Sequence, residues 1–180
     1  MRSEEVKEAV FAMYPDKSPG PDGMSPGFFQ HFWDVIGPDV VSFCRYAFES
    51  GSLPERVNHT HIVLIPKKEH PKVIGDWRPI SLCNVVYKIF SKMLANRMKS
   101  LLYGCISEQQ SVFIPDRSNV HNIMLAFESQ HYLKRKRQGK VGYATLKLDM
   151  SKAYDRVEWP YLEGMLRHLG FNERWVRCDY

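Results

Sequence analysis

The chain has 180 residues, about the length of one ordinary domain, and 44% of them are hydrophobic. That fraction excludes a disordered segment, and no stretch approaches the roughly 18 apolar residues of a membrane span. The net charge of +5, from 25 Lys+Arg against 20 Asp+Glu, is compatible with a polyanionic partner but does not demonstrate one.

The N-terminus and the cysteines bear on location. Residues 1–15 contain three glutamates and no apolar run, so a secretory signal is not expected. The four cysteines show no CxxC or Cys/His spacing typical of a metal site, and we expect free thiols in a reducing compartment. The sequence therefore predicts an intracellular protein, of the nucleus or the cytoplasm.

The first third of the chain predicts helices around a shaped loop. A helix begins at Ser3, with apolar residues following at helical spacing. Residues 18–23 contain two prolines and two glycines and cannot be regular structure. Residues 26–50 predict two helices broken at Gly37-Pro38, and Gly51 ends the second one.

A strand and two long helices are expected next. Residues 60–65 are apolar and β-branched and predict a strand that ends at Pro66. A polar loop is expected from there through Pro79. Residues 84–103 predict a helix whose apolar stripe is broken once, at Arg97, and that Gly104 ends. A further helix is expected over residues 118–137.

The last part of the chain predicts a second strand followed by two helices. Residues 141–150 alternate, which places Leu146 and Leu148 on one side and Asp149 on the other. A short helix is expected from Ser151, and another between Pro160 and Gly170. The order of elements predicts a helix-rich α+β fold with few strands.

Asp149 is the sharpest candidate for chemistry. A carboxylate at the end of a strand, before a turn into a helix, is well placed to hold Mg²⁺, which prefers oxygen ligands. The N–H groups of a helix beginning at Ser151 would suit a phosphate beside that metal. The alternative, favoured by the local pattern alone, is that Asp149 merely caps the helix.

Four segments, in order, resemble one family. Residues 147–159 (KLDMSKAYDRVEW) closely resemble the first catalytic motif of the reverse transcriptases of non-LTR (LINE-type) retrotransposons, particularly those of plants. Residues 17–23 (KSPGPDG), residues 62–82 with IPK and DWRPISL, and residues 106–115 with ISEQQ and FIP agree with the same family. The resemblance covers essentially the whole chain.

The resemblance implies a fold and a reaction. It implies part of a right-hand polymerase fold, with the fingers over about residues 1–140 and the start of the palm over about 141–180. The reaction would be RNA-directed DNA synthesis from an RNA template, a DNA primer and deoxynucleoside triphosphates, with two Mg²⁺ ions, or Mn²⁺, as cofactors. Because the sequence has no apolar stretch of membrane-spanning length, no membrane partner is expected. The family's downstream Asp-Asp pair does not occur in these residues. We therefore expect an N-terminal fragment that is inactive alone; the alternatives are a non-catalytic basic nucleic-acid-binding remnant and a fragment without a role.

The resemblance also assigns roles near the reacting atoms. Asp149 matches a metal-binding aspartate, and the Met150 carbonyl a backbone ligand of the metal. Lys152 and Ala153 would offer backbone amides to the triphosphate. Tyr154 matches the aromatic residue under the sugar of the incoming nucleotide, where core packing is the alternative.

Two positively charged residues match the family's grip on the triphosphate. They are Lys67 and Arg78. Binding a polyphosphate requires several positive charges, and the planar guanidinium of arginine can donate to two phosphate oxygens at once. Lys68 competes for the role of Lys67, and a solvated loop lysine is the plain alternative.

Contacts with nucleic acid are expected at two further places. By resemblance Gln109, Gln110 and Arg117 lie near the template. A basic run, defined here as Lys134, Arg135, Lys136 and Arg137, could contact template or primer phosphates, act as a nuclear import signal, or simply be a solvated helix end.

Overall fold

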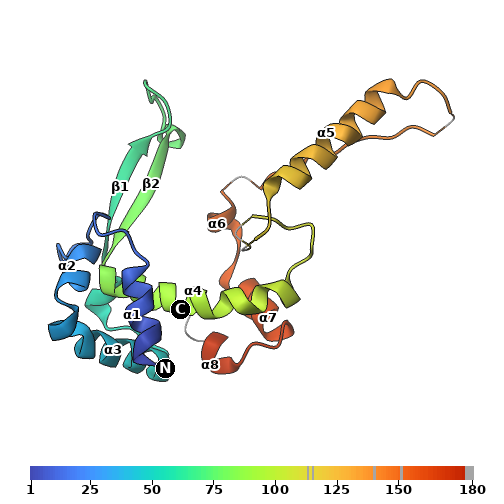
Figure 1. The fold of residues 1–180 in the computed structure, drawn as a ribbon. Helices are drawn as coiled ribbons and strands as arrows, with labels where there is room; N and C mark the ends of the chain where they lie inside the picture. The colour runs from blue at the N-terminus through green and yellow to red at the C-terminus, as the bar shows by residue number, and fades with distance from the viewer. Residues whose placement is uncertain (113, 115, 140, 151, 177–180) are drawn as a thin grey trace. The chain divides into compact units, whose positions relative to one another are not determined.

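A computed structural model describes residues 1–112, 114, 116–139, 141–150 and 152–176, with the side chains of Tyr154 and Asp155 outside the description. Its contacts form two compact units, Met1–Arg97 with Asn172–Tyr180, and Met98–Phe171 (Figure 1). The predicted fold class, helix-rich α+β with few strands, is confirmed. The expected boundary between fingers and palm near residue 140 stays a prediction.

Three helices open the first unit: α1 (Ser3–Phe11), α2 (Pro26–His31) and α3 (Trp33–Ser50). Gly51 caps α3 with a left-handed φ of 66°, as predicted. The predicted break at Gly37-Pro38 is wrong, because the chain breaks at Phe32 and Pro38 lies inside α3. A side chain at Gly37 would approach the Trp33 ring to 2.9 Å, so this glycine provides the space in which the ring packs on its own helix.

The sheet of the described chain is one antiparallel hairpin. Strand β1 (Thr60–Pro66) follows the 3-10 turn η1 (Glu55–Asn58), and β2 (Trp77–Cys83) follows the 3-10 turn η2 (Ile74–Asp76). The register runs from Thr60 opposite Cys83 to Pro66 opposite Trp77. The first strand is confirmed, but the loop predicted through Pro79 is wrong. Pro79 is accommodated because a two-stranded sheet consists of edge strands only.

Helix α4 (Val85–Cys105) supplies much of the core of the first unit. The buried cluster draws on α1, α2, α3 and α4 and consists of Val6, Ala9, Val10, Met13, Phe29, Val40, Cys44, Ala47, Val85, Ile89, Phe90, Met93 and Leu94. Arg97, which breaks the apolar stripe, pairs with Glu5 at 2.6 Å. Gly104 lies inside the helix rather than ending it. Helix α8 (Glu173–Val176) adds the buried Val176 and the half-buried Trp175, which packs against the core, to this unit.

The second unit contains α5 (Asn119–Arg135), α6 (Ala153–Arg156) and α7 (Trp159–His168). Ser118 caps α5 by accepting a hydrogen bond from the N–H of Val120. The strand predicted over residues 141–150 is wrong, since the described residues there form no strand. Leu146 and Leu148 are 79% and 83% exposed, and an extended segment becomes a strand only where a neighbour completes its hydrogen bonds.

Candidate active site

The hairpin brings Lys67 and Arg78 together. The N–H of Lys67 donates to the carbonyl oxygen of Asp76 at 2.7 Å, which extends the ladder one pair beyond Pro66 and Trp77. Arg78 lies opposite Ile65. Since side chains two apart share a face, Lys67 and Arg78 occupy diagonal positions on one face, which are typically about 7–8 Å apart. Both side chains are exposed.

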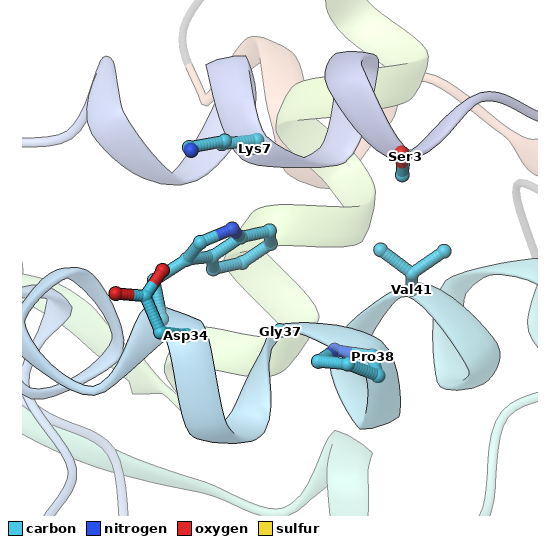
Figure 2. A pocket seen from close by; sticks show the side chains of 7 residues that line it. Ser3, Lys7, Asp34, Gly37, Pro38 and Val41 are labelled. Atoms are coloured by element: carbon cyan, nitrogen blue, oxygen red, sulfur yellow. The ribbon is translucent and has the colours of Figure 1, made fainter.

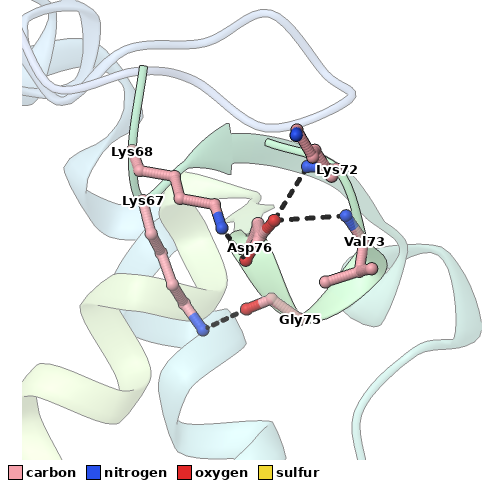
Figure 3. A network of polar contacts seen from close by, with 6 residues as sticks. All are labelled: Lys67, Lys68, Lys72, Val73, Gly75 and Asp76. Carbon is pink, nitrogen blue, oxygen red and sulfur yellow. Dashed lines mark hydrogen bonds and ion pairs between the residues drawn. The ribbon is translucent and has the colours of Figure 1, made fainter. Parts of the chain in front are cut away.

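A polar network folds the loop between the strands (Figure 3). The Oδ2 atom of Asp76 accepts hydrogen bonds from the N–H groups of Lys72 (2.8 Å) and Val73 (3.1 Å). Its Oδ1 atom lies 2.9 Å from Nζ of Lys68. The ammonium of Lys67 donates instead to the carbonyl oxygen of Gly75, at 2.9 Å.

The surroundings of Asp76 favour its charged form. The hydrogen bond from Lys68 is the largest cause of a lowered pKa, followed by the N–H of Lys72. Partial burial opposes them, and the N–H of Val73 and the charge of Lys67 add smaller effects in the lowering direction. Asp76 was not among the residues predicted from the sequence. The available signal was an aspartate that closes a lysine-rich loop just before a strand.

The segment that resembles the catalytic motif, residues 147–159, is called the catalytic-motif segment below. Its Asp149 and Met150 are exposed. Ser151, where a helix was expected to start, lies outside the described residues, and α6 begins at Ala153. Lys152 precedes it with a left-handed backbone (φ 54°, ψ 50°). At four residues, α6 is too short to act as the anion-binding helix N-terminus that we expected. Tyr154 lies in α6, but its side chain is outside the description.

The donor types of this segment suit a hard divalent cation. Carboxylate and backbone carbonyl oxygens are ligands that Mg²⁺ accepts, and Asp149 and Met150 offer one of each. Within the described ranges, no group of three His, Cys, Asp or Glu side chains is gathered for a metal. The segment therefore fits part of a metal site, with one carboxylate.

The three residues expected near the template lie in the connection between α4 and α5. Arg117 donates from Nη1 to the carbonyl oxygens of Ser107 (2.6 Å) and Gln110 (2.7 Å). The carbonyl oxygen of Gln109 accepts from Nδ2 of Asn122 at 2.7 Å, and Nε2 of Gln110 donates to Val112. These bonds give Arg117 a role in folding the loop, and contact with a template stays a prediction.

The basic run has three exposed members and one that is engaged. Lys134, Arg135 and Arg137 are exposed, the first two in the last turn of α5. Nζ of Lys136 lies 3.3 Å from the carbonyl oxygen of Val141 and 3.7 Å from the centre of the Tyr143 ring. Lys136 therefore links Val141 and Tyr143 to the end of α5, through a hydrogen bond and a cation–π contact.

A hollow of about 390 Å³ lies between α1 and α3 (Figure 2). Its lining includes the Trp33 ring, with Lys7 and Asp34 as the charged side chains. None of the residues predicted to bind substrate or metal lies in it. The hollow follows from the packing of two helices across a bulky ring. The hairpin tip (residues 67–76) in the first unit and the residues around Asp149 in the second unit remain two separate candidate sites.

Comparison with known proteins gives the class. Residues 65–179 match the family model described as reverse transcriptase (RNA-dependent DNA polymerase). This match covers well over half of the chain, including Lys67, Arg78 and Asp149. The chain belongs to the reverse transcriptase family.

Individual relatives narrow the comparison. The chain is 38% identical over 173 residues to the transposon TX1 uncharacterized 149 kDa protein of Xenopus laevis, covering 96% of this chain and 13% of that protein. It is 30% identical over 139 residues to the Pol polyprotein of the type-1 retrotransposable element R2 of Nasonia vitripennis, covering 77% of this chain and 13% of the relative. For the Drosophila melanogaster element R2DM the identity is 27% over 168 residues, covering 91% and 14%. The chain thus spans 13–14% of the length of these relatives. None of the helices in the described ranges is long and apolar enough to cross a membrane.

Proposed function

We propose that the chain forms the fingers and the first part of the palm of a right-hand polymerase, in the reverse transcriptase of a non-LTR retrotransposon of the plant LINE type. In this role it holds the incoming deoxynucleoside triphosphate and supplies one metal-binding carboxylate. The observation that carries the proposal is the hairpin, which places Lys67 and Arg78 on one exposed face within the part of the chain that matches the family.

The chemistry is a nucleotidyl transfer on an RNA template. The 3′-hydroxyl of the DNA primer gives up its proton to water and attacks the α-phosphorus of the triphosphate. A P–O bond forms, and pyrophosphate leaves with the electron pair of the broken P–O bond. Lys67 supplies a point charge and Arg78 a two-pronged donor to the phosphate oxygens. Such positioning accounts for much of the catalysis of phosphoryl transfer.

The catalytic-motif segment, residues 147–159, carries the other roles that the resemblance implies. Lys152 and Ala153 donate backbone N–H groups to the phosphates, and the ring of Tyr154 supports the sugar. Asp149 and the Met150 carbonyl would hold Mg²⁺, or Mn²⁺, which when bound screens the phosphate charge and activates the hydroxyl. Gln109, Gln110, Arg117 and the three exposed members of the basic run, Lys134, Arg135 and Arg137, contact template or primer.

Primer extension on an RNA template tests the proposal. We would join the chain to a downstream segment carrying the family's Asp-Asp pair, and compare it with Asp149→Asn. The variant is expected to lose extension with Mg²⁺ and with Mn²⁺, whereas Asp39→Asn, at an exposed position of α3, should retain it. Extension that survives Asp149→Asn would refute the metal-binding role.

A second candidate function is non-catalytic binding of nucleic acid. The observation that favours it is the exposure of three basic side chains at and just after the end of α5, Lys134, Arg135 and Arg137. The 180-residue chain alone is then expected to bind RNA without extending a primer. Extension by the chain alone would exclude this candidate.

A further inference from the structure

Two adjacent lysines at the hairpin tip have different partners. The ammonium of Lys68 lies 2.9 Å from a carboxylate oxygen of Asp76, and the side chain remains 55% exposed. The ammonium of Lys67 contacts a neutral acceptor, the carbonyl oxygen of Gly75. A carboxylate partner offsets the charge of an ammonium, whereas a carbonyl leaves that charge in place. The two lysines are therefore not equivalent toward an anion.

We propose that Asp76 is a positioning residue that directs the triphosphate to Lys67, by holding Lys68 in an ion pair and by folding the loop that sets Lys67 beside Arg78. The inference rests on the proposed function and deepens it, since it adds a residue that determines which lysine receives the phosphates.

The hydrogen bonds of Asp76 within the loop support its role in folding the loop. Asp76 accepts from the N–H groups of Lys72 and Val73 through one carboxylate oxygen, and its own carbonyl accepts from the N–H of Lys67 at 2.7 Å. The residue thus closes the loop and continues the ladder to Lys67. With only 15% of its side chain exposed, Asp76 is the more enclosed member of its ion pair.

The charges at the hairpin tip support the second role of Asp76, which is to hold Lys68 in an ion pair. Three lysines, Lys67, Lys68 and Lys72, lie within six residues and could each attract a polyphosphate. Because Lys68 is paired with Asp76, its ammonium attracts a polyphosphate less strongly than an unneutralised lysine would. The lowered pKa of Asp76 agrees with this pairing, because the hydrogen bond from Lys68 is its largest cause.

Two substitutions of Asp76 separate its role in folding the loop from its role in holding Lys68. Asp76→Asn keeps an oxygen that can accept both N–H bonds but removes the charge that holds Lys68. Asp76→Ala removes the bonds and the charge together. Hydrogen exchange of the Lys72 and Val73 amides reports on the loop without any ligand, and we expect fast exchange in the alanine variant and slow exchange in the asparagine variant.

The binding test uses inorganic tripolyphosphate and the 180-residue chain, followed by calorimetry and by NMR of the lysine side chains. Lys67→Ala should weaken binding about tenfold, as expected for a hydrogen bond to a charged group. Lys68→Ala should change it less than about twofold in the wild type but about threefold in the Asp76→Asn background, the size of a surface charge contact. Tripolyphosphate should shift the Lys67 signals in the wild type, and those of both lysines in Asp76→Asn.

The possible failures can be told apart. Tripolyphosphate binding that depends equally on Lys67 and Lys68, whether or not Asp76 is charged, would overturn the inference and leave the proposed function standing. Fast exchange at Lys72 and Val73 in the wild type would overturn the loop role of Asp76. A wild-type chain that binds no tripolyphosphate would refute the proposed triphosphate grip, and the inference with it.

Discussion

The side chain of Asn84 joins three segments at the base of the hairpin. Its Oδ1 atom accepts a hydrogen bond from the N–H of Asp22, and its Nδ2 donates to the carbonyl oxygens of Arg56 and Val57 at 3.2 Å. Gly20 lies directly against it. A Cβ atom at Gly20 would approach the Asn84 backbone nitrogen and Oδ1 to 2.4 Å, a distance that backbone atoms cannot relieve by rotation. The close approach explains a glycine within the predicted loop 18–23.

Gly20→Ala is therefore expected to lower the free energy of unfolding by about 1–3 kcal/mol, the usual cost of overpacking. Urea denaturation followed by circular dichroism measures it. Gly75→Ala is the matched control in the same unit, because a Cβ atom there meets nothing within 4 Å. Equal stability of the two variants would show that Asn84 and the loop yield to the added methyl group.

The charge of Asp76 predicts how the tip responds to pH. Its pKa in the folded chain is lowered from the ordinary 3.8, so its stabilising effect is complete above 3.8 and is lost as the pH falls through the lowered value. The amide NMR shifts of Lys72 and Val73 should stay constant from pH 7 to about pH 5 and then titrate with a midpoint below 3.8. In Asp76→Asn this titration should vanish. A midpoint above 3.8 would contradict the hydrogen bonds that Asp76 accepts.

Tyr154 predicts the choice of sugar in the completed polymerase. If its ring lies under the nucleotide, Tyr154→Val removes the steric barrier to a ribose 2′-hydroxyl and should raise incorporation of ribonucleotides relative to deoxynucleotides. The ratio of kcat/KM for the two substrates measures this effect. Tyr161→Val, at an exposed position of α7, is the control. An unchanged ratio in Tyr154→Val would make Tyr154 a packing residue.

Among the secondary-structure elements, the sequence predicted those whose ends depend on residues close to one another in the chain. The helix start near Ser3, the stop at Gly51 and the strand after residue 59 follow from caps and β-branched runs, and all are confirmed. The interior Pro38 was misjudged, because α3 runs through it; the Trp33 ring packs on Gly37, one turn along the same helix.

Longer-range partners account for the remaining errors. Residues Trp77–Cys83 form a strand because β1 pairs with them, although a polar loop was expected through Pro79. Residues 141–150 have the alternation of a strand without a partner in the described chain, and they remain irregular. At the site, residue types and spacing indicated Lys67 and Arg78. Only the register shows that they share a face, and only the folded loop reveals Asp76.

The end of α5 predicts how the basic run binds single-stranded RNA. Neutralising Lys134, Arg135 or Arg137 one at a time to Gln should lower the affinity, because each variant contacts fewer phosphates. The slope of log K against log salt should fall by about 0.7 for each phosphate that the variant no longer neutralises. Lys136→Gln is the internal control, because its ammonium is engaged by Val141 and Tyr143. Equal slopes for all four variants would show that these residues do not bind phosphate individually. Circular dichroism checks that α5 persists.

For the whole molecule, burial is concentrated in the first unit. There α1, α3 and the first half of α4 share a continuous core. No residue of α5 is buried, and Ile123, Leu125 and Phe127 are 65%, 62% and 73% exposed. Because most of the stability of a helix in a protein comes from packing one face, and α5 has no buried face, the two units should differ in local stability.

Hydrogen exchange measured by mass spectrometry at neutral pH should reveal this difference. Amides of α3 and of residues 85–94 should exchange more slowly than those of α5 and of residues 141–150, by about 100-fold or more, since opening the core exposes far more apolar surface than fraying α5. Gly20→Ala, which perturbs the first unit, should speed exchange in α3 and leave α5 unchanged. Protection of α5 equal to that of α3 would show that its apolar side chains are covered in solution. Repeating the measurement across a range of protein concentrations would then decide whether a second copy of the chain provides that cover.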